Sequence, residues 1–308
     1  MKMLNVINGP QNVSRIILGC MRMPALNVQQ AAEMISTAAE LGINFFDHAT
    51  CYSDGEAETR FGDAFPLTGL KREDVVIQSK CGLHFDRREF DWSKEDILAS
   101  VDGSLERLKT DHLDVLLLHR PDVLYDPCEV AEAFDKLYRE GKVIHFGVSN
   151  VPPMQIELLK RYVAQPLIFN QLQLSLDQSQ LIDAALYVNN LTTERSVDRD
   201  NGLLDYCRLH DITIQAWSPL QIGMFKGCFV DHPDFPELNA VLARLGEKYG
   251  VSKTAVAIAW ILRHPAKMQA IAGTMDPGHL RNICGAAKVE LTHHEWYELY
   301  LASGKFLP

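Results

Sequence analysis

Short apolar runs alternate with helical patterns along the whole chain, and this alternation constrains the fold more than any other feature. A typical unit is the near-continuous apolar run at 113–119, followed by a helical pattern at 129–140 that Gly141 ends. Continuous apolar runs suit strands that are buried on both faces, as in parallel sheets. Eight such units at fairly even spacing predict a closed (β/α)8 TIM barrel rather than an open doubly wound sheet. No G-x-G-x-x-G follows the first strand, which counts against a Rossmann domain.

The boundaries of the predicted elements follow from apolar periodicity and from capping residues. Alternation at 4–8 and 13–18, around Gly9-Pro10-Gln11-Asn12, predicts an N-terminal β-hairpin. The polar, charged stretch 189–202 is predicted to be a loop at the mouth of the barrel. We expect strands at 16–19, 43–47, 74–80, 113–119, 143–150, 167–171, 213–217 and 269–273, and helices at 28–41, 56–65, 94–109, 129–140, 154–162, 203–209, 238–249, 253–262, 279–287 and 293–303.

Composition limits the class of protein and its partners. The 308 residues, 47% hydrophobic and 23% charged, suit one barrel domain spanning 1–308. A formal net charge of -10 argues against nucleic acid as a partner. Neither a signal peptide nor a run of transmembrane length is apparent, so we expect no membrane association. Seven scattered cysteines without C-x-x-C predict reduced thiols in a cytoplasmic protein. No metal is expected, because no set of histidines has convincing ligand spacing.

Polar side chains end several of the predicted strands, and in a TIM barrel these ends meet at one mouth. Asp47, Lys80 and His119 hold such positions, and Tyr52 lies just beyond Asp47. A lysine at the end of an apolar strand is costly unless it is paired, and Asp47 can pair with it. Next to that ammonium group, the pKa of Tyr52 is expected to fall from about 10 toward neutrality. Tyr52 would then act as a general acid on a carbonyl oxygen to which His119 also donates a hydrogen bond.

Over nearly its whole length the chain resembles the aldo-keto reductase superfamily. Each motif is weak alone, but together they occur in the right order and close to strand ends. The motifs are Phe46-Asp47-x-Ala49-x-x-Tyr52 with Glu58 and Gly62, Ser79-Lys80, Ser104-Leu105-x-Arg107-Leu108 with the strand that ends at His119, Gly147-Val148-Ser149-Asn150, Asn170-Gln171 and Trp217-Ser218-Pro219-Leu220. Within the superfamily the chain most resembles a branch of bacterial predicted oxidoreductases, which is marked by Ser79-Lys80-Cys81-Gly82 and His119-Arg120-Pro121-Asp122.

The resemblance implies an NADP(H)-dependent reductase of aldehydes or ketones, with a small-molecule carbonyl substrate. Its catalytic tetrad maps onto Asp47, Tyr52, Lys80 and His119. NAD(H) is an alternative cofactor, because Met275 and the nearby Asp276 occupy a segment where NADPH-preferring members often carry Lys or Arg. Cofactor contacts map onto Ser149, Asn150, Gln171, Trp217, Ser218, Pro219, Leu220, Gly223, Gly273, Thr274, His279, Arg281 and Asn282.

Two other functions stay open at this point. Lys80 could be the amine of a Schiff-base lyase, or the chain could be a nucleotide-binding regulatory protein of the same fold with little turnover. Cys51 is expected to be small apolar filler, since no Cys/His pairing at the spacing of a nucleophile is apparent in the sequence. Arg120 suits either an acidic substrate or an ion pair with Asp122, and Phe225 is a further candidate for the substrate pocket. The sequence specifies neither the carbonyl substrate nor the oligomeric state.

Overall fold

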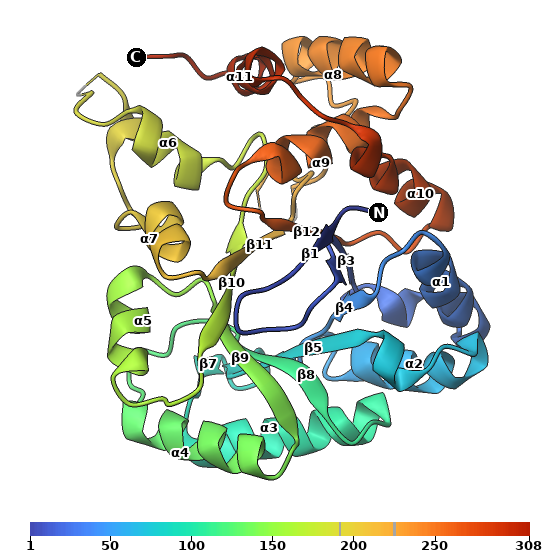
Figure 1. Cartoon of the computed structure of the whole chain (residues 1–308), viewed down its shortest axis with the longest axis vertical. Helices are drawn as coiled ribbons and strands as arrows, with labels where there is room; N and C mark the ends of the chain where they lie inside the picture. The colour runs from blue at the N-terminus through green and yellow to red at the C-terminus, as the bar shows by residue number, and fades with distance from the viewer. Residues whose placement is uncertain (191, 224–225) are drawn as a thin grey trace.

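The computed structural model describes residues 1–190, 192–223 and 226–308, so the candidate Phe225 and one residue of the predicted 189–202 loop lie outside the described residues. Eight parallel strands form a closed barrel, which confirms the predicted fold (Figure 1). Each strand pairs with the next along the chain, and β12 pairs with β3 to close the ring. The barrel strands are β3 (Ile16–Gly19), β4 (Phe45–Asp47), β5 (Val76–Cys81), β8 (Leu113–Leu118), β9 (Val143–Ser149), β10 (Leu167–Gln173), β11 (Thr213–Trp217) and β12 (Gln269–Ala272).

Helices surround the barrel on its outside (Figure 1). Their predicted boundaries are confirmed to within a few residues, because most of them begin and end at recognisable caps. For example, Ser93 accepts a hydrogen bond from the Asp96 amide at the start of α3. The helices are α1 (Val28–Glu40), α2 (Glu56–Ala64), α3 (Lys94–Leu108), α4 (Pro127–Arg139), α5 (Pro153–Lys160), α7 (Leu203–Leu209), α8 (Pro236–Tyr249), α9 (Lys253–Arg263), α10 (Pro277–Cys284) and α11 (His293–Ala302).

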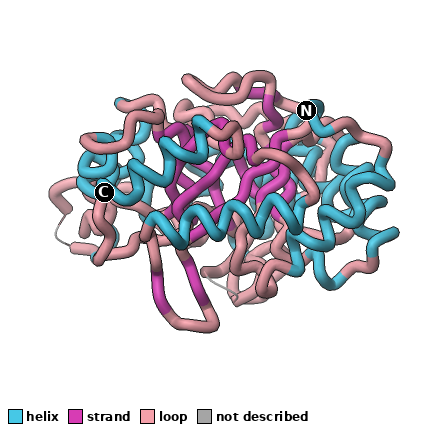
Figure 2. Tube along the Cα trace, turned by 90° about the horizontal axis from the view of Figure 1, so that it is seen from below, coloured by secondary structure: helices cyan, strands magenta, loops and turns pink. Residues whose placement is uncertain are grey.

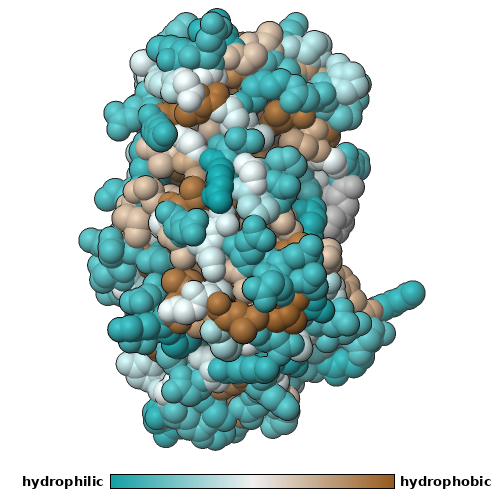
Figure 3. All heavy atoms as spheres, turned by 90° about the vertical axis from the view of Figure 1, so that its right-hand side faces the viewer, coloured by the Kyte–Doolittle hydropathy of each residue, from teal (hydrophilic) through white to brown (hydrophobic). Residues whose placement is uncertain are grey.

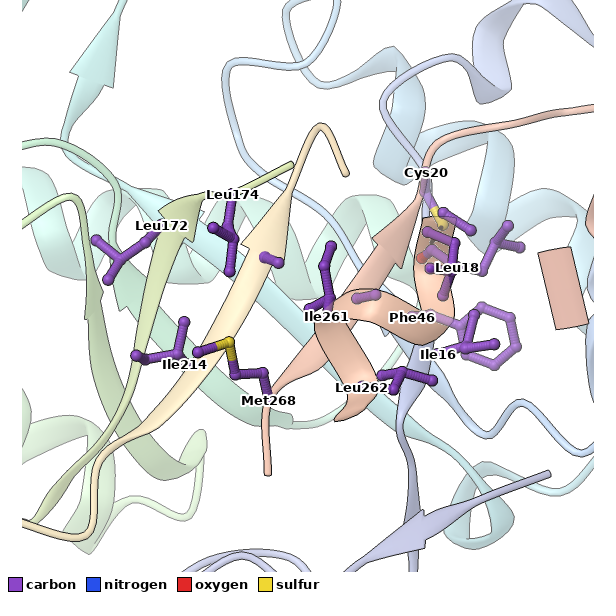
Figure 4. Close-up of a cluster of buried hydrophobic side chains, with 14 of the residues drawn as sticks. Ile16, Leu18, Cys20, Phe46, Leu172, Leu174, Ile214, Ile261, Leu262 and Met268 are labelled. Carbon is purple, nitrogen blue, oxygen red and sulfur yellow. Dashed lines mark hydrogen bonds between the residues drawn. The ribbon is translucent and has the colours of Figure 1, made fainter. Parts of the chain in front are cut away.

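Successive residues of each strand face opposite sides of the barrel wall. Side chains on the outer side pack against the helices, as Ile16 and Ile214 do near Ile261 of α9 (Figure 4). Side chains on the inner side form a separate apolar cluster that includes Val76 and Phe169. This inner cluster fills the barrel, so polar inward-facing side chains stand out against it.

The N-terminal hairpin is present but shorter than predicted. β1 (Met3–Leu4) pairs antiparallel with β2 (Val13–Ser14). The predicted strand at 4–8 is wrong beyond Leu4, because the chain turns there: the Val6 amide donates to the Pro10 carbonyl at 3.1 Å and the Gly9 amide to the Val6 carbonyl at 3.1 Å. Val6 nevertheless belongs to the apolar cluster inside the barrel.

Two features at the loops were not predicted. A ribbon of β6 (Leu83–His84) and β7 (Glu89–Phe90) follows β5, and Figure 2 shows it projecting from the end of the barrel opposite the N-terminal hairpin. Helix α6 (Gln180–Leu186) follows β10.

Within the described ranges, no helix combines the length and apolarity that a membrane span requires. On the face shown in Figure 3, apolar side chains occur in small groups among polar ones.

Candidate active site

Lys80 joins three groups at the mouth of the barrel. Its ammonium nitrogen lies 2.8 Å from Asp47 Oδ2, 2.8 Å from the His48 carbonyl oxygen and 3.1 Å from the Tyr52 hydroxyl oxygen. Lys80 is fully buried and Asp47 is almost so. The predicted pairing of Lys80 with Asp47 is therefore confirmed, and the three acceptors satisfy all three N–H donors of the ammonium group.

A tight turn carries Tyr52 back over Lys80. The Tyr52 amide donates to the Ala49 carbonyl at 3.1 Å, and the next three residues, Ser53, Asp54 and Gly55, all have positive φ. At Gly55, where φ is 88°, a Cβ atom would lie 2.7 Å from the Arg107 side chain. Glycine therefore satisfies both the left-handed backbone and the close packing at this position.

Glu58, which follows this turn on α2, anchors the turn to two neighbouring elements. Its buried carboxylate accepts hydrogen bonds from Ser79 of β5, from Ser104 of α3 at 2.9 Å and from Arg107 Nε at 2.8 Å. Both carboxylate oxygens are thus satisfied away from water. Since Ser79 precedes Lys80, this arrangement holds the strand of the lysine against the helix that follows Tyr52.

His119 lies on the other side of Tyr52, with its ring centroid 5.9 Å from that of the phenol. Its Nδ1 is 3.5 Å from Cys51 Sγ. The expectation that Cys51 is only apolar filler misses this contact, because the loop between β4 and α2 brings Cys51 and His119 together. Burial raises the pKa of the Cys51 thiol to about 11, so this cysteine is a weak hydrogen-bond donor and not a nucleophile.

The electrostatics of the site differ from the expectation at Tyr52. Burial raises the pKa of Tyr52 to about 12, and the opposing effect of Lys80 does not overcome it. The predicted fall toward neutrality is therefore wrong, because the phenol is more strongly desolvated than the lysine alone can offset. Burial and the charges of Lys80 and Arg120 hold the pKa of His119 well below its ordinary value, so its ring is neutral at neutral pH.

The same balance bears on the lyase alternative. Burial alone would lower the pKa of Lys80, but Asp47 and Tyr52 outweigh burial and raise it above its ordinary value. A Schiff-base mechanism requires an uncharged amine as nucleophile. A charged Lys80 that donates to three acceptors disfavours that reading.

Several residues predicted to bind the cofactor lie side by side at the ends of β9, β10 and β11. Ser149 Oγ donates to the Gln171 carbonyl at 2.9 Å and accepts from Asn150 Nδ2 at 2.8 Å. Asn150, with φ of 60°, accepts a hydrogen bond from the Trp217 indole at 3.1 Å. The Arg120 guanidinium lies over the Trp217 ring, 5.6 Å from its centroid. The Asp122 carboxylate instead accepts from the Trp92 amide at 3.1 Å and the Leu124 amide at 2.8 Å, so the alternative pairing of Arg120 with Asp122 is wrong.

The Gln171 side chain was expected to contact the cofactor, but its amide nitrogen points into the barrel. It donates to Asp47 Oδ1 at 3.0 Å and to Gln215 Oε1 at 3.1 Å. Gln78 donates to the same Asp47 oxygen at 2.6 Å. Gln78 and Gln215 were missed from sequence, although each is a polar residue within a short apolar strand. Gln78 is also two residues before Lys80 and therefore on the same face.

The remaining predicted contacts lie beyond β11 and β12. Because these strands are neighbours, Ser218, Pro219, Leu220 and Gly223 leave the barrel beside the segment that begins at Gly273. Ser218 and Gly223 have positive φ, and the Gly273 carbonyl oxygen accepts a hydrogen bond from Arg22 at 2.8 Å. Thr274 is half-buried, and the side chains of His279, Arg281 and Asn282 on α10 are exposed.

Comparison with known proteins shows the family. A model of the aldo/keto reductase family matches residues 15–300. The chain belongs to the aldo/keto reductase family. It is 34% identical over 306 residues to 6-dehydroglucose reductase of Agrobacterium fabrum, with 95% of each chain covered. It is 33% identical over 306 residues to the oxidoreductase YdhF of Escherichia coli, covering 96% of this chain and 95% of that one.

Solved structures of the family share the fold. An aldo/keto reductase from Klebsiella pneumoniae, determined in complex with NADP and acetate, is 26% identical and superposes with a TM-score of 0.72. The comparison covers 94% of this chain and 91% of that one. The barrel and the family inferred from the motifs are thereby confirmed.

Proposed function

We propose that this aldo/keto reductase reduces an aldehyde or ketone to an alcohol, with NADPH as its cofactor and Tyr52 as the acid that protonates the carbonyl oxygen. The observation that carries the proposal is the contact between Lys80 Nζ and the Tyr52 hydroxyl oxygen at 3.1 Å. An ammonium group can only donate, so the phenol accepts from Lys80 and keeps its own hydrogen for another acceptor. A carbonyl oxygen at the mouth of the barrel is such an acceptor.

The proton transfer follows from the surroundings of the phenol. As Tyr52 loses its proton to the carbonyl oxygen, the phenolate that forms stays beside the Lys80 ammonium. Asp47 keeps that ammonium charged from the opposite side, 2.8 Å away. Burial strengthens both interactions, since water does not screen them.

His119 would orient the carbonyl group. The Cys51 thiol is protonated at neutral pH and faces Nδ1 of the ring, and we assign Nδ1 as the acceptor of its S–H group. A neutral imidazole with an accepting Nδ1 carries its hydrogen on Nε2. Nε2–H can then donate to the same carbonyl oxygen that Tyr52 protonates.

The chain offers suitable residues at both ends of a nicotinamide cofactor, which supplies a hydride when bound. Trp217, Asn150 and Ser149 would hold the nicotinamide, and their mutual hydrogen bonds keep them in place beforehand. At the other end, the Arg281 guanidinium and the His279 imidazole are exposed on α10 and suit a 2′-phosphate. The negative charge of the Asp276 carboxylate disfavours a phosphate at this place. Asp276 caps the same helix and accepts a hydrogen bond from the His279 amide at 2.7 Å.

The similarity to 6-dehydroglucose reductase favours a hydroxylated sugar aldehyde as the substrate, and Arg120 and Asn150 place polar groups at the mouth for such a compound. All seven cysteines are free thiols, which supports a reducing compartment such as the cytoplasm.

Tryptophan fluorescence titration with NADPH and, in parallel, NADH tests the cofactor. The same protein is then assayed for oxidation of each cofactor with 4-nitrobenzaldehyde and with 6-dehydroglucose. We expect NADPH to bind and to be consumed with at least one aldehyde. Binding without turnover would support the regulatory alternative, and absence of binding by either nucleotide would contradict the proposal.

A further inference from the structure

Four glutamine side chains form a hydrogen-bonded network inside the barrel, next to the candidate active site. Gln78, Gln171, Gln215 and Gln269 are buried and come from β5, β10, β11 and β12. They lie on the inward-facing side of strands whose other inward residues are mostly apolar. A barrel interior that only needed to be packed would hold apolar residues here, since a buried amide is costly unless it is hydrogen-bonded.

The hydrogen bonds of this network connect two groups at its ends through the four amides. Gln269 Nε2 donates to the Ser14 carbonyl at 2.8 Å, and its Oε1 accepts from Gln215 Nε2 at 3.1 Å. Gln215 Oε1 in turn accepts from Gln78 at 2.9 Å and from Gln171 at 3.1 Å. Gln215 Nε2 also donates to Gln78 Oε1 at 3.1 Å, so these two amides bond reciprocally. Both ends are groups that can only accept, the Ser14 carbonyl and the Asp47 carboxylate.

The pattern of donors and acceptors fixes the orientation of the two amides next to Asp47. If Gln78 or Gln171 were turned over, its oxygen would face the carboxylate and its present bond to Gln215 Oε1 would be lost. As arranged, two N–H groups converge on Asp47 Oδ1, at 2.6 Å from Gln78 and 3.0 Å from Gln171. Oδ2 is left for Lys80, at 2.8 Å.

We propose that Gln78, supported by Gln215, is a positioning residue that holds Asp47 in the rotamer that pairs with Lys80 and thereby sets the geometry of Lys80 and Tyr52. The proposal rests on the reductase function proposed above. Gln78 does not touch the reacting atoms and acts through Asp47. Without its N–H group, Asp47 can rotate about its side-chain bonds, and the Lys80 ammonium follows it away from Tyr52.

The test compares two variants with the same chemical change. Gln78→Met removes the amide with little change of side-chain length. Gln269→Met makes the same change in the same network, equally buried, but Gln269 does not contact Asp47. Gln78→Met removes three hydrogen bonds and Gln269→Met removes two, so a purely structural role predicts losses of stability of similar size and no selective effect of Gln78→Met on catalysis.

We expect Gln78→Met to lower kcat for aldehyde reduction about tenfold, the scale of a hydrogen bond to a charged group. KM for the aldehyde and the affinity for NADPH should stay unchanged, and the solvent deuterium isotope effect on kcat should rise because proton transfer becomes slower. Gln269→Met should leave kcat and the isotope effect unchanged. Equal kcat values in the two variants, with a loss only of thermal stability, would overturn the proposal.

Crystal structures of both variants make the test independent of turnover. In Gln78→Met we expect the Asp47 carboxylate to rotate away from Lys80, and in Gln269→Met we expect it to keep its position. An unmoved Asp47 in Gln78→Met would contradict the proposal even if no aldehyde were reduced by the wild type. Absence of turnover in the wild type, with a rotated Asp47 in the variant, would instead contradict the proposed reductase function alone. If Gln78→Met does not fold, Gln78→Glu serves in its place and should lose activity as pH rises and its added carboxyl ionises beside Asp47.

Discussion

The ammonium group of Lys80 donates a hydrogen bond to the hydroxyl oxygen of Tyr52 over 3.1 Å. This contact orders the phenol so that its own O–H can point toward a substrate. It also places a positive charge where the phenolate would form.

Removing the charge of Lys80 should destabilise the fold. Lys80→Met leaves the Asp47 carboxylate buried without its ionic partner, which we expect to lower the free energy of unfolding by about 3–5 kcal/mol. The double variant Lys80→Met with Asp47→Asn should recover part of this loss, because no unpaired charge remains. Urea unfolding monitored by tryptophan fluorescence measures both. A double variant less stable than the single one would show that the pair is not the source of the loss.

The pH dependence of the two reaction directions should differ. With a pKa of about 12, Tyr52 stays protonated through neutral and mildly alkaline pH. Carbonyl reduction, which needs the protonated phenol, should therefore be flat in kcat/KM from pH 7 up to mildly alkaline pH. Alcohol oxidation needs the phenolate and should rise with pH over the same range. The positive charge of the oxidised nicotinamide shifts this rise to lower pH without changing its sign. A reduction rate that falls between pH 7 and 8 would contradict this assignment.

The thiol of Cys51 should influence His119 through its hydrogen bond. Cys51→Ala removes the donor that faces Nδ1, so the ring is free to adopt the tautomer with its hydrogen on Nδ1. We expect kcat/KM for the aldehyde to fall about fivefold, in keeping with one neutral hydrogen bond. Cys51→Ser keeps a donor at this position and should recover most of the activity. Equal activities of the alanine and serine variants would rule out a role for the donor.

The carboxylate of Asp276 should weaken binding of NADPH more than binding of NADH. Asp276→Asn keeps the cap of α10, since Asn and Asp are equally good N-caps, but removes a negative charge near the proposed 2′-phosphate site. We expect the Kd for NADPH to fall about fivefold while that for NADH stays constant. Asp126→Asn, the same change at the N-cap of α4, is the matched control. A change of the same size for both cofactors would place Asp276 away from the 2′-phosphate.

The barrel and the proximity of the proposed site residues could be predicted from sequence for a simple physical reason. Parallel strands bring their carboxyl ends to one edge, so Asp47, Lys80 and His119 meet without any knowledge of the loops. Capping residues such as Ser93 marked where helices begin. Motif order then placed the chain in its family.

The conformation of the loops and the pKa values of buried groups could not be predicted in the same way. The contact between Cys51 and His119 depends on a turn with successive positive φ angles at 53–55. The pKa of Tyr52 depends on how deeply the phenol is buried relative to the strength of the Lys80 charge, which the sequence does not show. The ribbon consists of the two-residue strands β6 and β7, which are too short for a periodic pattern.

The central claim is that Tyr52 is the proton donor, and Tyr52→Phe tests it most directly. The variant removes only the hydroxyl group, so NADPH should still quench tryptophan fluorescence with unchanged Kd. We predict that kcat for aldehyde reduction falls by about 10²–10⁴. A Tyr52→Phe variant that binds NADPH and reduces the aldehyde at the wild-type rate would contradict the account.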